Sequence, residues 1–126
     1  MPRVEPMLRP ITAVPATVVE RARGASIQVL VGPEDGADRL VTRCFTMAPG
    51  GRIPTHRHAD IEHQQVVLEG AMVVSLDGRE RVARVGDCLL IPAGVAHWYE
   101  NRGAEAVRFL CMIPRTESYR TEWLEE

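Results

Sequence analysis

Short apolar runs alternate with turn residues between residues 17 and 113. Pro, Gly, Asn and Asp end each run after a few residues, which is typical of β-strands and too short for most helices. The pattern predicts strands at residues 26–31, 40–47, 63–68, 71–76, 79–85, 88–91, 96–100 and 107–113. The dipeptide Asp77-Gly78 between two of these runs predicts a tight hairpin turn. Regularly spaced short strands indicate an all-β barrel or sandwich.

Two predicted strands are apolar on both faces, at residues 66–68 and 89–91. Such strands are expected to be buried on both sides, either between two packed sheets or under a partner subunit. The ends of the chain differ from this pattern. Four prolines predict that residues 1–16 form an extended arm, while Tyr119 and Trp123, four residues apart in the tail 115–126, fit a short helix that packs on the barrel or on a partner. We expect one domain, residues 1–126, with a barrel core at about 38–114.

The amino-acid composition excludes several classes of function. The 126 residues are 45% apolar and 25% charged, and the formal net charge of −2 shows no block of like charges, which argues against binding to nucleic acid or to an anionic membrane. No apolar run is long enough to span a bilayer, and the proline-rich N-terminus lacks a secretory pattern, so a cytoplasmic location is expected. All 15 basic residues are arginine, which excludes mechanisms that need a lysine. Three cysteines without a CxxC pair are expected to be free, buried thiols.

The four histidines of the chain have a spacing that suits one metal. His56 and His58 would lie on the same face of a strand, about 6–7 Å apart along the chain. His63 follows after a turn, and His97 comes directly after the turn at residues 92–94. Four neutral imidazoles suit a divalent first-row metal, with Fe, Mn, Ni, Cu and Zn all possible.

The glycines and prolines around these histidines resemble the two motifs of the cupin superfamily. Gly50 is followed by five residues, His56-x-His58 and a closing Gly70. The second motif is complete, from Gly86 through Pro92-x-Gly94 and His97 to Asn101. The short interval between the two motifs is similar to that of small single-domain bacterial cupins. The resemblance implies a jelly-roll barrel, also described as a double-stranded β-helix.

One position departs from the usual motif. Counted back from Gly70, the position of the usual glutamate falls on His63 and not on Glu62. This is similar to single-domain cupins with a four-histidine site, and it implies that His56, His58, His63 and His97 are the metal ligands. The alternative, three histidines and Glu62, would need a bulge, because neighbouring residues of a strand point to opposite faces.

Residues on the same strand faces are candidates for the wall of a substrate pocket. Gln65 lies two residues beyond His63, and Tyr99 two beyond His97, so these two polar side chains are the candidate catalytic groups. The expected pocket is completed by side chains from two long strands. These are Phe45, Phe109 and Cys111, with Arg43 and Met47 as further candidates beside Phe45.

The resemblance implies metal-dependent oxygenases foremost, then isomerases, lyases and binding modules. The absence of an obvious general base favours chemistry carried by the metal on a small, largely apolar substrate. We therefore predict a dioxygenase-type oxidoreductase that uses Fe or Mn. The alternatives are a non-catalytic cupin that binds or senses a small molecule or metal, and a metal-assisted isomerase or lyase acting on a sugar or polyketide-like carbonyl compound. Apolar strand faces and the resemblance both favour a homodimer.

Overall fold

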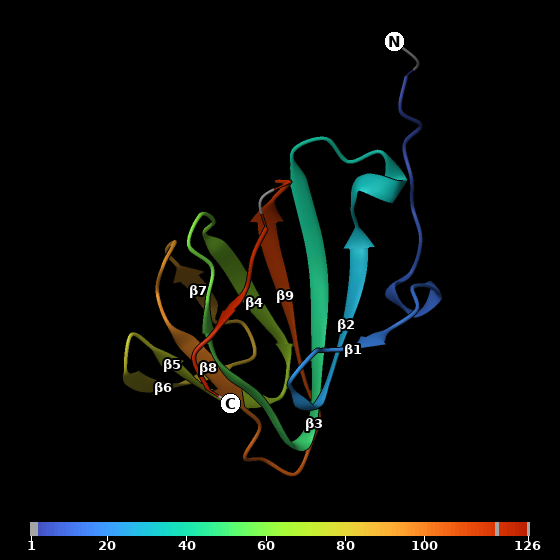
Figure 1. Cartoon of the computed structure of the whole chain (residues 1–126). Coiled ribbons are helices and arrows are strands. Elements are labelled where there is room, and N and C mark those ends of the chain that lie inside the picture. Colours follow the sequence, from blue (N-terminus) through green and yellow to red (C-terminus); the bar gives the residue numbers. More distant parts are fainter. Residues whose placement is uncertain (1–2, 118, 126) are drawn as a thin grey trace.

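A computed structural model describes residues 3–117 and 119–125, in which the regular structure is β apart from two short 3-10 turns (Figure 1). The described part of the chain contains no α-helix and therefore no helix that could cross a membrane. The 3-10 turns are η1 (Ile11–Ala13) and η2 (Pro33–Asp35). The strands are β1 (Thr17–Val18), β2 (Arg23–Val31), β3 (Leu40–Arg57), β4 (His63–Glu69), β5 (Ala71–Leu76), β6 (Arg79–Arg84), β7 (Cys88–Ile91), β8 (His97–Glu100), β9 (Val107–Pro114) and β10 (Glu122–Trp123).

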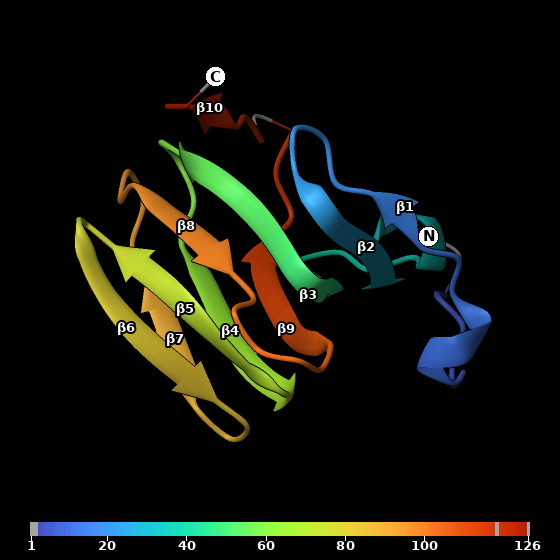
Figure 2. The same ribbon diagram turned by 90° about the horizontal axis from the view of Figure 1, so that it is seen from below.

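These strands form one curled sheet in which neighbouring strands are antiparallel. The order is β6-β5-β8-β3-β9-β4-β7, and β2 and β10 add to β3. The first half of β3 pairs with β2 and β9, whereas its second half pairs with β8 and β10, so β3 belongs to both walls of the molecule (Figure 2). The result is a half-barrel, which confirms the predicted all-β jelly-roll architecture.

The predicted end of a strand at Met47 is wrong, because β3 continues to Arg57. Gly50, at φ +80°, changes the direction of the strand instead of ending it. Asn101 holds this corner: its backbone N–H donates to the Gly51 carbonyl (2.9 Å), and its fully buried side chain donates to the Met47 carbonyl (3.1 Å). Asn101 and Gly50 of the two motifs therefore join the corner of β3 to the end of β8.

The other predicted strands are present within a few residues of their expected bounds, and β5 and β7 match them fully. The hairpin between β5 and β6 has Asp77 and Gly78 at φ +53° and +82°, as a tight turn of this kind requires. Among the described residues, β7 is not buried on both faces, because Leu90 is 59% exposed. The thiol positions also differ from expectation: Cys44 and Cys111 are buried, but Cys88 is exposed.

The predicted C-terminal helix is wrong. Residues Glu122 and Trp123 form β10, which pairs with Arg57 and His56 of β3. A separation of four residues places Tyr119 and Trp123 on one face of a helix, but it does the same in a strand. The tail follows the two-residue period of a strand, because its alternate residues Tyr119, Thr121 and Trp123 all line the same cavity.

Gly70 and Gly86 provide a test of the motif glycines. Both have positive φ, at +73° and +89°. A Cβ at Gly70 would lie 2.6 Å from the Ala106 carbonyl oxygen, whereas a Cβ at Gly86 would meet nothing within 4 Å. We expect Gly86→Ala to lower the free energy of unfolding by about 1–2 kcal/mol. Gly70→Ala should cost roughly 1–3 kcal/mol more, because overpacking adds to the backbone strain.

Urea unfolding of both variants and the wild type measures this difference. Equal losses at the two positions would contradict the close approach of β9 to Gly70.

Candidate metal centre

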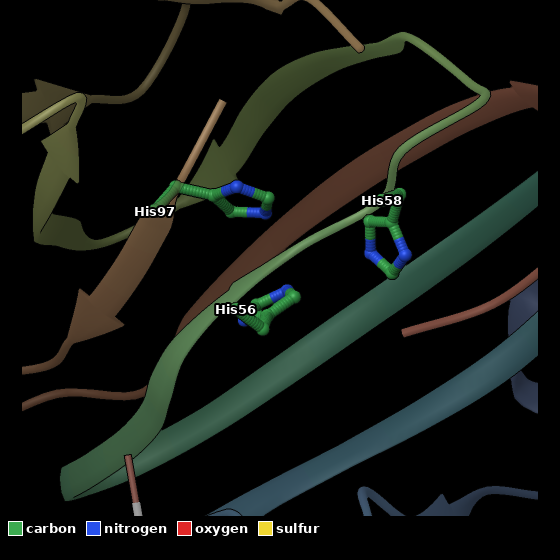
Figure 3. Close-up of side chains that lie close together, drawn as sticks. All are labelled: His56, His58 and His97. Atoms are coloured by element: carbon green, nitrogen blue, oxygen red, sulfur yellow. The ribbon is translucent and has the colours of Figure 1, made fainter. Parts of the chain in front are cut away.

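Three histidines converge inside the half-barrel. His56 lies near the end of β3, His58 directly after it, and His97 at the start of β8. His56 and His97 are opposite each other in the antiparallel register, which brings their rings to a centroid distance of 4.2 Å. One ligand nitrogen from each of the three residues lies within 4.8 Å of the others (Figure 3). All three side chains are buried.

Hydrogen bonds orient each of these rings. Their Nδ1 atoms donate to backbone carbonyls: His56 to Pro54 (2.7 Å), His97 to Val95 (2.9 Å) and His58 to Arg120 (2.9 Å). A ring that donates from Nδ1 keeps the lone pair of Nε2 free for a metal. The three rings are therefore held in the tautomer that suits coordination.

The rings are also uncharged at neutral pH. Burial, together with the proximity of neighbouring imidazoles, lowers the pKa of His56, His58 and His97 to about 4 each. Because only a neutral imidazole binds a metal, these groups need not lose a proton to do so. Converging, neutral and oriented imidazoles fit a divalent first-row metal.

His63 lies beside this group but outside it. The side chain is 2% exposed, and its ring centroid is 4.5 Å from that of His58 and 5.9 Å from that of His97. Burial, followed by electrostatic repulsion from His58 when both rings are protonated, lowers the pKa of His63 to about 2. Glu62 points the other way: it is exposed and accepts a hydrogen bond from Gln64 (3.3 Å). The structure thus shows a group of three histidines, with a fourth histidine in the same cavity.

A cavity of about 240 Å³ opens in front of the histidines. Of the residues expected in its wall, Phe45, Gln65, Tyr99 and Cys111 are present, and Arg43 joins them. Phe109 does not line it; its fully buried ring stacks behind Phe45 at a centroid distance of 5.1 Å. Met47 is likewise in the core. Further side chains that sequence reasoning missed complete the wall, from β1 and the turn after it, from β2 and β3, and from the C-terminal tail: Val18, Val19, Glu20, Ile27, Ile53, Tyr119, Thr121 and Trp123.

Polar side chains form a buried network along one side of the cavity. The Tyr99 hydroxyl and the Gln65 side-chain amide are within hydrogen-bonding distance, and the Gln65 Nε2 donates to the Cys111 Sγ (3.4 Å). The Arg43 guanidinium donates to the same sulfur (3.1 Å). Burial raises the pKa of Tyr99, so its hydroxyl stays protonated and can donate a hydrogen bond.

Residues 119–125, here named the C-terminal strap, cover the centre. Tyr119 stacks on the His58 ring (centroid distance 4.9 Å), and Trp123 lies against His56 (5.0 Å). Glu125 anchors the strap through a two-pronged ion pair with Arg52 (3.0 and 3.1 Å) and a hydrogen bond from the Thr55 backbone N–H. The only sequence signal for this role is the pair of aromatic residues in a polar tail.

An antiparallel half-barrel with buried imidazoles converging in its cavity defines a jelly-roll protein that can hold a metal in its interior. The chain belongs to the cupin family: residues 43–113 match the family model described as Cupin domain (Cupin_2). It is a small cupin with a three-histidine group.

Its relatives include proteins from Streptomyces. Polyketide synthase CurC of Streptomyces cyaneus is 34% identical over 91 residues, which are 71% of this chain and 59% of CurC. Tetracenomycin polyketide synthase protein TcmJ of Streptomyces glaucescens is 29% identical over 100 residues, covering 75% of this chain and 67% of TcmJ. The structure of the polyketide cyclase RemF from Streptomyces resistomycificus superposes with a TM-score of 0.84 at 31% identity, over all of this chain and 87% of RemF.

Proposed function

We propose that this protein is a metal-dependent cupin that cyclises a polyketide-type carbonyl compound by intramolecular aldol condensation and loss of water. The observation that carries the proposal is the group of three oriented, neutral imidazoles at the end of a largely apolar cavity. Its relationship to RemF, a polyketide cyclase, and to CurC and TcmJ supports carbonyl chemistry over the dioxygenase hypothesis.

The proposed ligand set includes a fourth residue. His56, His58 and His97 would hold the metal, and we include His63 because its buried ring faces the same cavity at 4.5 Å from that of His58. When bound, a divalent metal supplies a Lewis acid that polarises a ketone oxygen. Fe, Mn, Ni, Cu and Zn all accept imidazole ligands, and Fe or Mn remains our preferred pair.

The remaining residues of the cavity bind and orient the substrate. Tyr99, protonated at neutral pH, donates a hydrogen bond to a ketone oxygen and can give that oxygen its proton when a C–C bond forms at the carbonyl carbon. Gln65 fixes the position of the Tyr99 hydroxyl (2.8 Å). Phe45 and Ile53 provide an apolar wall that excludes water and suits a folded polyketide chain.

A short triketone tests this proposal without a carrier protein. In heptane-2,4,6-trione a terminal methyl carbon would bond to the far ketone carbon, its proton would pass to that oxygen, and one water would leave to give 5-methylresorcinol. No oxidant is consumed. We expect the metal-loaded protein to form this product at the same rate in air and under argon, and the Tyr99→Phe variant to be slower by about 100-fold.

Chromatography measures the amount of 5-methylresorcinol formed, and an oxygen electrode measures whether oxygen is consumed. Turnover that requires oxygen would favour the dioxygenase hypothesis. Binding of the triketone without turnover would favour the hypothesis of a binding or sensing cupin. Thr121→Ser is a control, since it changes the cavity wall by one methyl group and leaves Tyr99 untouched.

We also propose that the protein acts as a homodimer on a small-molecule substrate. Apolar side chains on the outer faces of several strands support this, among them Leu90 of β7, which is 59% exposed, and Val82 of β6, which is 49% exposed. A partner subunit would provide the second buried face that the apolar pattern of β7 predicts.

A further inference from the structure

Arg43 is a buried charged residue in the cavity wall whose position the metal centre does not explain. It lies on β3 in the wall of the cavity and is only 7% exposed. Two of its nitrogens are partnered: Nη1 donates to the Tyr119 hydroxyl (3.1 Å), and Nη2 donates to the Cys111 Sγ (3.1 Å). The Nε atom is buried and has no hydrogen-bond partner among the residues that the structure describes. The guanidinium lies over the rings of Phe45 and Tyr119, at 5.2 and 5.5 Å from their centroids.

No carboxylate within residues 3–117 and 119–125 forms an ion pair with Arg43. Glu20, the acidic residue of the cavity wall, is exposed and makes no ion pair with it. The histidines nearby are neutral at neutral pH and would be positive if protonated, so they supply no negative charge to Arg43. Burying a charge without an ion-pair partner costs several kcal/mol, and a bound anionic ligand would offset that cost.

We propose that Arg43 is an anion-binding group, and that the compound bound in this cavity carries a carboxylate. A guanidinium offers five N–H donors, of which the structure uses two, and a carboxylate is the partner that accepts two of them at once. The rings of Phe45 and Tyr119 flank the guanidinium and suit a flat or unsaturated group next to the carboxylate. The inference rests on the proposed function, since it names the charge of the substrate of that same cavity.

Matched acid and amide ligands test this inference. Calorimetric titration of the metal-loaded full chain compares 2-naphthoate with 2-naphthamide, which has the same shape and no charge. We expect naphthoate to bind about 10- to 100-fold more tightly, as a charged hydrogen-bonded pair in a buried site allows. In Arg43→Met the two affinities should agree within about threefold, because the charged partner is gone. Arg43→Lys should keep part of the preference for naphthoate, since lysine keeps the positive charge but lacks the paired N–H donors of a guanidinium.

Three controls complete the experiment. Metal content is measured for every variant. If it is equal, a weaker binding of naphthoate cannot be explained by the loss of a metal ion that binds its carboxylate. Arg108→Met removes an arginine that pairs with Glu69 away from the cavity and should leave both affinities unchanged. The melting temperature of Arg43→Met is measured as well, because this variant removes a buried charge together with its hydrogen bonds to Tyr119 and Cys111. If Arg43→Met does not fold, Arg43→Gln takes its place.

Equal binding of acid and amide by the wild type would overturn the proposal, as would a preference for naphthoate that survives in Arg43→Met. The cyclisation of heptane-2,4,6-trione uses a substrate without a carboxylate. A wild type that prefers naphthoate but does not cyclise the trione would therefore reject the proposed reaction on an uncharged substrate and keep the role of Arg43, and equal binding of the two naphthyl ligands would reject the role of Arg43 alone.

Discussion

Replacing His97 with alanine is expected to weaken metal binding by more than 100-fold. Loss of an outer hydrogen-bond partner of a ligand costs about 10- to 100-fold in metal affinity, and loss of the ligand itself costs more. His97 is opposite His56 in the β-ladder and supplies one of three nitrogens that lie within 4.8 Å of one another. Elemental analysis of the purified variant and titration with Co²⁺, followed by absorption, measure the loss.

The same experiment decides the role of His63. We expect His63→Ala to weaken Co²⁺ binding by at least about 10-fold, since it removes a proposed ligand. Glu62→Ala is the matched control: the two residues are neighbours, but Glu62 is exposed and its carboxylate accepts a hydrogen bond from Gln64. Unchanged affinity in His63→Ala would leave a three-histidine site. Loss of affinity in Glu62→Ala would contradict the ligand set altogether.

Removing the C-terminal strap is expected to have the second largest effect. Truncation after Glu117 deletes the Arg120 carbonyl that accepts the Nδ1–H of His58 (2.9 Å) and the Tyr119 ring that stacks on it. His58 would then lose both its fixed tautomer and its fixed orientation. We expect metal affinity to fall by about 10- to 100-fold, while the barrel core, which has its own sheet pairing, remains folded.

Point variants in the C-terminal strap distinguish a residue that anchors the strap from one that only adds charge to the surface. Glu125 binds Arg52 and the Thr55 backbone, and these hydrogen bonds lower its pKa to about 2. Glu122 pairs with Arg57, and both of these side chains are largely exposed. Glu125→Ala should therefore weaken Co²⁺ binding, whereas Glu122→Ala should change it little. Equal effects of the two, or full affinity after truncation, would show that the strap does not orient His58.

The pH dependence of the anchor has a definite sign. The carboxyl of Glu125 has a lower pKa in the folded protein than its ordinary value of 4.5. Its contribution to docking of the strap is therefore complete above about pH 4.5 and is lost as the pH falls through about 2.

Local patterns in the sequence predicted most of the barrel. Strand length, turn residues and the period of two are properties of neighbouring residues, so β5 and β7 were located to the residue. The alternation rule also separated buried His63 from exposed Glu62. The end of β3 was misjudged because Pro49-Gly50-Gly51 has the composition of a turn. Its actual role depends on Asn101, which follows β8 and holds the corner from some fifty residues away in the sequence.

The prediction of a helix in the C-terminal tail is the larger error, and it also has a physical cause. The spacing of Tyr119 and Trp123 fits one face of a helix and one face of a strand equally well. Only pairing with β3, more than sixty residues earlier, selects the strand. The same reasoning explains Phe109: its alternation with Cys111 was correct, but whether a ring on that face reaches the cavity depends on Phe45 packing in front of it.

By itself the sequence determined that the chain is all-β, because strand period and turn spacing are local properties, and its resemblance to the cupin motifs indicated which histidines face the interior. The tertiary structure decided what surrounds those histidines. It brought the carbonyl of Arg120 to His58 and left Arg43 buried in the cavity wall without an ion-pair partner among the described residues. Neither could be read from the chain, since partners distant in sequence set the burial of a charge and the tautomer of a ring.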